Sequence, residues 1–200
     1  MKMAKRILSL VLVLVMFASL SVTAFADTPA TPYINVTVKN SRSGATDSWT
    51  VAATTGASVK SALDTDTVHA RDWKPVADYY NPSTIRYVLN GYGAYASTKF
   101  DKNYAQDVKN LKDAGYTDAA IKKITWYTGA YQGYGLVSYD ETTGEYTYIY
   151  AGYDWTYSSN LSPQIGSYMC CYNVQANEVV QLVYQFTVSR WTTTTPLVSA

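Results

Sequence analysis

The side chains with the most distinctive chemistry in this sequence are tyrosines, and many of them lie in one stretch. The segment GEYTYIYAGYDWTYSSN, residues 144–160, holds five tyrosines and one tryptophan, and the whole chain has 20 Tyr against 4 Phe. A tyrosine combines a flat apolar ring with a hydroxyl that can reach water or a polar group. Such rings suit a binding surface for sugars, peptides or a planar cofactor. The residues that we expect to bind a ligand are Tyr134, Tyr146, Tyr148, Tyr150 and Tyr153.

The same tyrosines also have a purely structural interpretation. Tyr146, Tyr148 and Tyr150 alternate with other residue types, so a strand in this stretch puts three rings on one face. Cross-strand aromatic pairs stabilise a sheet by roughly 0.2–1 kcal/mol each, and Trp155 is the ring that we most expect in the core. The two interpretations differ in exposure, because binding tyrosines should be partly exposed and grouped on one surface.

Catalysis has little support in the sequence. No G-x-S-x-G, H-E-x-x-H or cysteine–histidine spacing is present. Asp140, Glu141 and Asp154 could act as acid–base carboxylates, but the first two suit a turn and the third a strand edge. A glycan-processing enzyme would need two carboxylates about 5–10 Å apart in a cleft. We therefore expect no enzymatic activity and no cofactor, and keep the glycan-processing enzyme as the catalytic alternative.

The two cysteines, Cys170 and Cys171, are adjacent. A bond between neighbours closes a strained ring, so we expect both to stay thiols, with one packed inward as a small hydrophobe. A vicinal disulfide, an intermolecular bond and metal binding are the alternatives. The pair lacks the spacing of a zinc site, and the single histidine, His69, is far away in sequence. We therefore expect no metal site.

The N-terminus has the pattern of a secretory signal peptide. Lys2, Lys5 and Arg6 precede an apolar run from Ile7 to Leu20, and the segment then ends at Ala24-Phe25-Ala26 with the small-x-small pattern of a cleavage site. The apolar run, about fourteen residues, is shorter than the roughly 20 of a membrane-spanning helix. The pattern predicts a signal peptide over 1–26, a linker over 27–32 and a secreted, extracellular product.

The charge of the chain limits the classes of binding partner that we expect. Without the three N-terminal cations, 13 Lys and Arg face 15 Asp and Glu. No basic stripe is present, so we expect neither nucleic acid nor, after signal cleavage, a membrane as partner. A small-molecule or glycan ligand, and a cell-surface or wall component, remain as expected partners.

The predicted elements form a strand-rich α+β domain over 33–191, followed by a flexible tail over 192–200. Strands are expected at 33–39 and 48–53 as a hairpin, with three short strands within 133–160 and a long alternating strand within 177–190. Asn90-Gly91 predicts a tight hairpin turn. Helices are expected after Ser58, from about 104 to Gly115, and after Thr117. The segment at about 65–130 is expected to be an insertion in the strand framework.

Three short motifs give the chain a resemblance to a known family. The first is a helix start with Gly56, Ser58, Val59, Ala62 and Leu63. The second is a W-x-Y-x-x-N strand with Trp155, Tyr157 and Asn160. The third is a final strand with Tyr172, Val174, Val179 or Val180, and Tyr184. This order resembles bacterial secreted domains related to the C-terminal β-domain of transcobalamin and intrinsic factor. Where those domains have Gly-Asp before the last strand, this chain has Asn177-Glu178, and Asn160 is followed by Leu161 rather than Gly.

The resemblance implies a β-grasp-like fold: a mixed sheet with one short packed helix. It implies a function less directly, because related folds hold different sites. We expect a non-catalytic extracellular binding module whose ligand is a corrinoid, a glycan or a peptide. The alternative is a surface adhesion or assembly protein that acts through strand edges.

Overall fold

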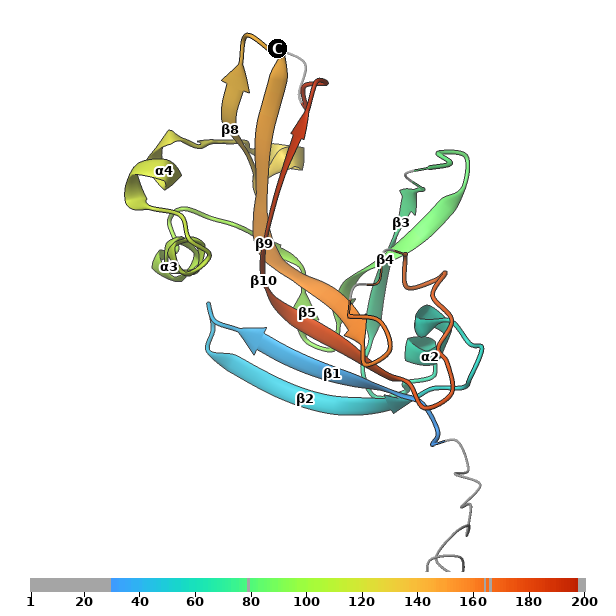
Figure 1. The fold of residues 1–200 in the computed structure, drawn as a ribbon. Helices are drawn as coiled ribbons and strands as arrows, with labels where there is room; N and C mark the ends of the chain where they lie inside the picture. The colour runs from blue at the N-terminus through green and yellow to red at the C-terminus, as the bar shows by residue number, and fades with distance from the viewer. Residues whose placement is uncertain (1–29, 79, 164, 166, 198–200) are drawn as a thin grey trace, which may run out of the picture. The chain divides into compact units, whose positions relative to one another are not determined.

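Two long antiparallel strands, β9 (Glu145–Ser159) and β10 (Val179–Thr193), form the centre of the fold (Figure 1). They pair from Val180 opposite Ser159 to Thr193 opposite Tyr146. The computed structural model describes residues 30–78, 80–163, 165 and 167–197. The predicted signal peptide and residues 27–29 of the predicted linker lie outside the described residues.

Shorter strands extend this pair on both sides into a sheet of seven strands. The order is β2-β1-β10-β9-β8-β7, with β6 also paired to β9, and β1 runs parallel to β10. The added strands are β1 (Tyr33–Asn40), β2 (Ala45–Ala52), β6 (Thr98–Lys99), β7 (Thr125–Trp126) and β8 (Tyr134–Asp140). A second sheet, in the order β3-β4-β5, contains β3 (Arg71–Ala77), β4 (Ile85–Tyr92) and β5 (Tyr95–Ala96). The protein is therefore strand-rich α+β, as the sequence predicts.

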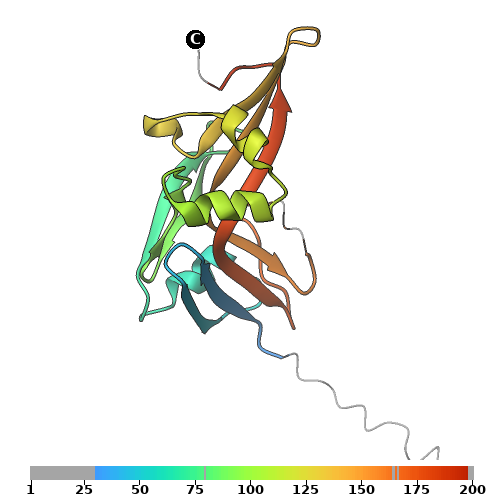
Figure 2. The same cartoon turned by 90° about the vertical axis from the view of Figure 1, so that its left-hand side faces the viewer.

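Two apolar clusters flank different parts of the long strands. One contains Val36, Leu63 and Leu182 and lies between β1, β10 and the short helix α2 (Val59–Asp64). The other contains Leu111 and Ile149 and packs α3 (Ala105–Asp113) against β9. Figure 2 shows α3 crossing the long strands, with α4 (Asp118–Lys123) beside it. A 3₁₀ turn, η1 (Gly129–Tyr131), precedes β8.

The helices begin and end where their capping residues predict. Ser58 accepts a hydrogen bond from the Ser61 N–H at the start of α2, and Thr117 does the same for Ala120 at the start of α4. Gly115, just after α3, has a φ of +95°, a conformation that glycine adopts at little cost. All three predicted helices are therefore confirmed.

The predicted turn at Asn90-Gly91 is wrong, because both residues lie inside β4. The chain reverses two residues later, at Gly93, whose φ is +60°. Gly91 serves close packing instead of turning: a Cβ there would lie 3.3 Å from the Cβ of Asp72. The strand partner, not the local dipeptide, decides what this glycine does.

The prediction of three short strands within 133–160 is also wrong, because β8 is followed by one unbroken strand of 15 residues. Gly152 does not break β9. It lets β6 approach, since a Cβ at Gly152 would lie 2.8 Å from the carbonyl oxygen of Thr98 and 2.9 Å from the Tyr150 hydroxyl. The turn that Asp140 and Glu141 suggest is confirmed: it connects β8 to β9, and its Gly144 has a φ of +70°.

The last strand is confirmed, but it continues to Thr193, so the first two residues of the predicted tail belong to β10. Residues 65–130, the predicted insertion, contribute the three-stranded sheet, α3, α4 and the short strands β6 and β7. The predicted β1–β2 hairpin is confirmed, with its turn at residues 41–44.

Two asparagines hold the turn that precedes β10. Asn160, at the end of β9, accepts a hydrogen bond from the Val179 N–H at 2.7 Å through its side chain. Asn177 has a φ of +61° and is the single non-glycine residue with positive φ among the described residues. Next to it Glu178 is fully buried, and it accepts bonds from the Tyr172 hydroxyl at 2.5 Å and the Gln175 N–H at 2.6 Å.

Candidate functional site

The structure separates the five predicted site tyrosines into two groups. Tyr148 and Tyr153 are each 1% exposed, so the expectation that they are partly exposed is wrong. Tyr134, Tyr146 and Tyr150 are half-buried. Trp155, predicted to be core, is 7% exposed, which confirms that prediction.

Tyr148 is buried because elements distant in sequence cover it. Trp191 of β10 lies opposite it in the ladder, with ring centroids 5.8 Å apart. Tyr127, which follows β7, packs against it at 6.5 Å, and the N–H of Leu197 donates to its hydroxyl at 2.9 Å. The alternation in β9 correctly predicts which residues share a face, but both faces of this strand are covered.

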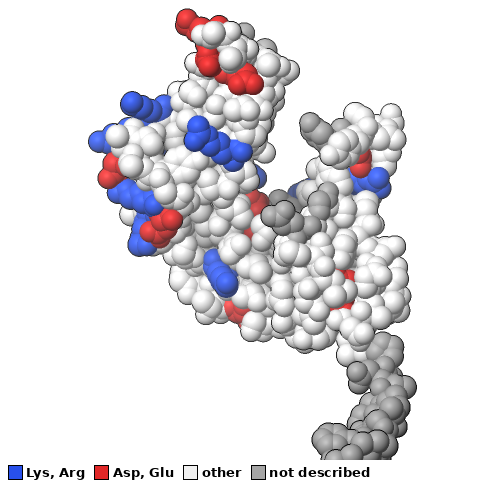
Figure 3. Space-filling model, viewed as in Figure 1, with Lys and Arg blue, Asp and Glu red and all other residues white. Residues whose placement is uncertain are grey.

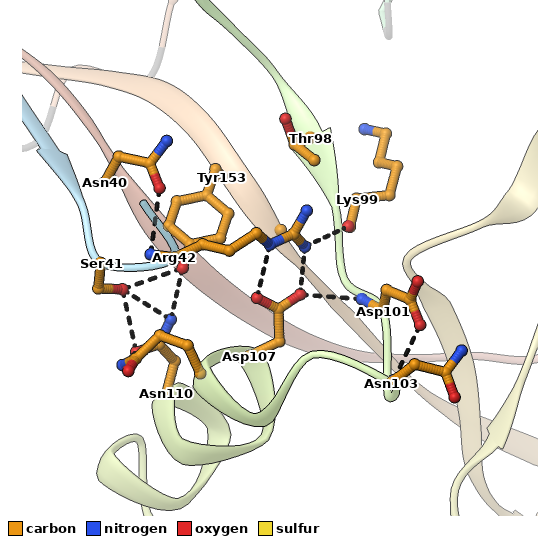
Figure 4. Close-up of polar contacts among 12 residues, drawn as sticks. Asn40, Ser41, Arg42, Thr98, Lys99, Asp101, Asn103, Asp107, Asn110 and Tyr153 are labelled. Carbon is orange, nitrogen blue, oxygen red and sulfur yellow. Dashed lines mark hydrogen bonds and ion pairs between the residues drawn. The ribbon is translucent and has the colours of Figure 1, made fainter. Parts of the chain in front are cut away.

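Tyr153 belongs to a polar clamp between the β1–β2 turn and α3 (Figure 4). Its hydroxyl lies 2.9 Å from both Ser41 Oγ and Asn110 Nδ2. The side chain of Arg42 forms a two-bond ion pair with Asp107, which is fully buried. The hydrogen bond to Asp107 raises the pKa of Arg42, although burial opposes this rise.

The clamp also fixes the position of β6. Arg42 Nη2 donates to the carbonyl oxygen of Lys99 at 3.1 Å, and Asp107 accepts the N–H of Asp101 at 2.9 Å (Figure 4). The backbone on both sides of Phe100 is therefore attached to one buried ion pair. Lys99 in turn pairs with Gly152 of β9, so the clamp sets where the Lys99 side chain begins.

A cleft of about 340 Å³ lies between β4, β9 and the connection from β9 to β10. This volume is in the range of small-molecule sites. Figure 3 shows the surface hollowed between the β3–β4 strands and β8–β10, with acidic atoms visible inside. The aromatic lining residues are Tyr87, Trp155, Tyr157 and Tyr168, and the polar ones include Asn90, Ser97, Lys99 and Asp154.

One side of the cleft carries a charged pair held by a tyrosine hydroxyl. Lys99 Nζ donates to the Tyr150 oxygen at 2.9 Å, and Tyr150 donates its proton to Asp154 Oδ2. Burial, followed by the hydrogen bond to Asp154, raises the pKa of Tyr150 well above its ordinary value. Tyr134 packs on the Tyr150 ring at 4.8 Å between centroids. Tyr150 thus joins the charged pair and Tyr134 packs on Tyr150, although neither is among the residues that line the cleft.

The opposite wall depends on the connection from β9 to β10. Tyr157 donates its hydroxyl proton to the carbonyl oxygen of Ser167, which ties this segment to β9. Burial is the main cause that raises the pKa of Tyr157 to about 12, so the hydroxyl keeps its proton at neutral pH. Tyr87 is 40% exposed, and its ring has the ammonium of Lys60 at 5.4 Å from the centroid.

The two cysteines directly follow Tyr168 and Met169, which line the cleft. They lie in a turn in which the Cys171 N–H donates a hydrogen bond to the Tyr168 carbonyl oxygen at 2.8 Å. Both are free thiols, with their sulfurs 3.3 Å apart. Cys170 is half-buried and Cys171 is exposed, so the expectation that one of them packs into the core is wrong. Burial, followed by the hydrogen bond to Cys170, raises the pKa of Cys171.

A second cavity of about 380 Å³ lies beside Phe100, Trp126 and Tyr127. The rest of its lining is formed by residues 101–103, 128, 129, 132 and 133, most of them outside helices and strands. The cleft at β4 and β9 is the better candidate, because it combines four aromatic side chains with a charged pair whose geometry is set by a third group.

The described residues carry few groups suited to other chemistry. Within the part of the chain that the structure describes, no group of three or more His, Cys, Asp or Glu could hold a metal ion. Asp154 is the sole carboxylate among the described residues that line the cleft, and Asp140 and Glu141 lie at the β8–β9 turn. In the same described part, no helix has the length and apolar character needed to cross a membrane.

Sequence patterns did not identify Tyr87, Asn90, Lys99 or Tyr168 as site residues. None of them belongs to a binding motif, since Asn90 is part of a turn signal only, and the pairing of β6 with β9 is what brings Lys99 to the Tyr150 hydroxyl that bonds Asp154. For Asp154, the sequence predicts only a possible acid–base role, not a place in a binding cleft. Neither a protein-family model, nor a curated protein, nor a solved structure matches this chain.

Proposed function

We propose that this protein is a secreted, non-catalytic binding module that holds a small polar ligand in the cleft between β4 and β9. The observation that carries the proposal is the charged pair of Lys99 and Asp154, joined by Tyr150, beside aromatic walls in a cavity of about 340 Å³. Sites for small molecules typically combine apolar walls with a few placed polar groups.

The resemblance to the C-terminal β-domains of transcobalamin-like proteins supports the same type of module, with a β-grasp-like fold. Trp155 and Tyr157 of its W-x-Y-x-x-N motif line the cleft. The cavity is near the lower limit of small-molecule sites, so a whole corrinoid would extend far beyond it. A glycan or peptide segment fits its size better.

Titration of the purified protein with wall glycans, short peptides and corrinoids tests the proposal. Tyr87→Ala should weaken binding of the active probe by about tenfold, since a ring that stacks on a ligand contributes roughly 1–3 kcal/mol. Stability should change by less than about 1 kcal/mol, because Tyr87 is 40% exposed.

Tyr139→Ala is the matched control, because Tyr139 is 48% exposed and is not a lining residue. Equal effects of the two substitutions on binding would contradict a site in this cleft. The secretion part has a separate test: N-terminal sequencing of protein from the culture medium should give a start near Asp27. Protein that stays in the membrane and still begins at Met1 would contradict secretion.

An assembly role through a strand edge is the second candidate, and the position of β2 favours it. Among the described strands, β2 ends the seven-stranded sheet and pairs only with β1. Such an edge can accept a further strand. Sedimentation at increasing protein concentration tests self-assembly of this kind, and a monomer at every concentration would count against it.

A further inference from the structure

We propose that the ligand in the cleft is a neutral pyranose unit of a glycan, bound through two adjacent ring hydroxyls, one on Lys99 and the other on Asp154. The inference rests on the proposed function, because it names the ligand class of the same cleft. Charge balance, hydrogen-bonding capacity, wall chemistry and size support it.

The charged side of the cleft has one positive and one negative group close together. Lys99 Nζ is 2.9 Å from the Tyr150 oxygen, and the same oxygen is hydrogen-bonded to Asp154. The ammonium and the bonded carboxylate oxygen are therefore at most two hydrogen-bond lengths apart, about 5–6 Å. An ion placed here is attracted by one group and repelled by the other at similar range. The pair therefore gives little net preference for a singly charged ligand.

A hydroxyl group, in contrast, can satisfy both charges. Its O–H donates to a carboxylate and its lone pairs accept from an ammonium. Hydrogen bonds to charged groups are also the stronger class. Two adjacent hydroxyls on a sugar ring present two such oxygens side by side, which matches a neighbouring donor and acceptor. The side chains of Asn90 and Ser97, also in the lining, offer amide and hydroxyl partners for further ring oxygens.

The walls and the size fit the rest of a sugar ring. Tyr87, Tyr157 and Tyr168 contribute rings to the lining. Aromatic faces carry negative charge density, which suits the C–H face of a pyranose. A volume of about 340 Å³ is near the lower limit for small-molecule sites, which suits one or two sugar units.

A peptide end is the strongest competitor, because it also carries charges. Its ammonium and carboxylate would both have to lose water on entering the cleft, and this desolvation is costly unless the pairing is excellent. A neutral sugar avoids that cost. Binding of a peptide in place of a sugar is therefore one of the results that the test can give.

The test is a set of NMR titrations of the isotope-labelled protein with defined probes. These are the methyl pyranosides of glucose, galactose, mannose and N-acetylglucosamine, their monodeoxy analogues, methyl glucuronide, the dipeptide Ala-Ala and cyanocobalamin. At least one neutral pyranoside should shift the amide signals of the cleft residues. Loss of either of two adjacent hydroxyls should weaken its binding by about tenfold. Methyl glucuronide should bind no more tightly than its neutral parent.

Variants connect the binding to the charged pair. Asp154→Asn and Lys99→Met should each weaken pyranoside binding by about tenfold or more, because each removes one charged hydrogen-bond partner. Asp47→Asn and Lys122→Met are matched controls on exposed parts of β2 and α4 and should leave binding unchanged. The amide spectrum of each variant shows whether its fold is intact.

Two negative results can be told apart. If Ala-Ala or cyanocobalamin shifts the cleft signals and no pyranoside does, the sugar inference is overturned while the binding function stands. If no probe shifts any cleft signal up to its solubility limit, the sugar inference fails. The proposed function fails as well if the unmodified protein also shows no binding in the titrations with wall glycans and short peptides. Pyranoside binding that is insensitive to both Asp154→Asn and Lys99→Met would also overturn the inference.

Discussion

Replacement of Tyr148 by alanine should destabilise the protein strongly and leave ligand binding intact. Tyr148 is 1% exposed, with the rings of Trp191 and Tyr146 at 5.8 and 6.1 Å between centroids. Truncation of a buried aromatic side chain costs about 3–5 kcal/mol, because transfer energy is lost and a cavity remains. Its hydroxyl accepts a hydrogen bond from the Leu197 N–H and also interacts with the Tyr127 hydroxyl. Tyr148→Phe should therefore cost only about 1 kcal/mol.

Urea unfolding followed by tryptophan fluorescence measures these free energies of unfolding. Tyr139→Ala, at a position 48% exposed, is the control and should change stability by less than about 1 kcal/mol. A Tyr148→Ala protein with near-normal stability and weakened ligand binding would refute the reasoning. It would mean that Tyr148 faces a ligand and not the core.

Three further predictions concern the clamp, the turn before β10 and the thiols. Asp107→Ala should lower the free energy of unfolding in urea by about 3–5 kcal/mol, because it removes a fully buried carboxylate and leaves the half-buried Arg42 guanidinium without its ion-pair partner. Asp113→Ala, in an exposed pair, should cost less than about 1 kcal/mol, and equal costs would contradict a clamp. Burial alone would raise the pKa of Glu178, but hydrogen bonds outweigh it and lower the pKa. The stabilisation that results is present above the ordinary value of about 4.3 and is lost as pH falls through the lower folded value. Glu178→Gln should therefore flatten the loss of melting temperature between about pH 6 and 3, and an unchanged acid dependence would argue against this assignment. Cys170 and Cys171 should each take one alkyl group in intact-mass measurements under denaturing, non-reducing conditions, and a monomer that takes none would reveal a vicinal disulfide.

Local features were predictable wherever a short segment determines its own conformation. Ser58 and Thr117 cap helices, and Gly144 takes a positive φ in a turn, since these preferences depend on neighbouring residues alone. The positive φ of Asn177 likewise follows the preference of asparagine for this conformation.

Glycines inside strands were not predictable in the same way. Gly91 and Gly152 have the local features of a turn or a strand break, but each lies within a long strand where a neighbouring element approaches closely. The approaching atoms belong to residues such as Thr98, far away in the sequence. A pattern of neighbouring residues therefore cannot predict these close approaches.

By itself, the sequence determined the strand-rich class, the helix ends, the long alternating strand β10 and the concentration of tyrosines in β9. Only the tertiary structure decided which of these tyrosines are core. Alternation tells which side chains share a face, but the burial of Tyr148 and Tyr153 depends on what covers that face. The cleft was decided in the same way, because Lys99 reaches the Tyr150 hydroxyl, and through it Asp154, only when β6 pairs with β9. Burial and long-range pairing depend on how distant segments pack together, and a pattern of neighbouring residues does not contain that information.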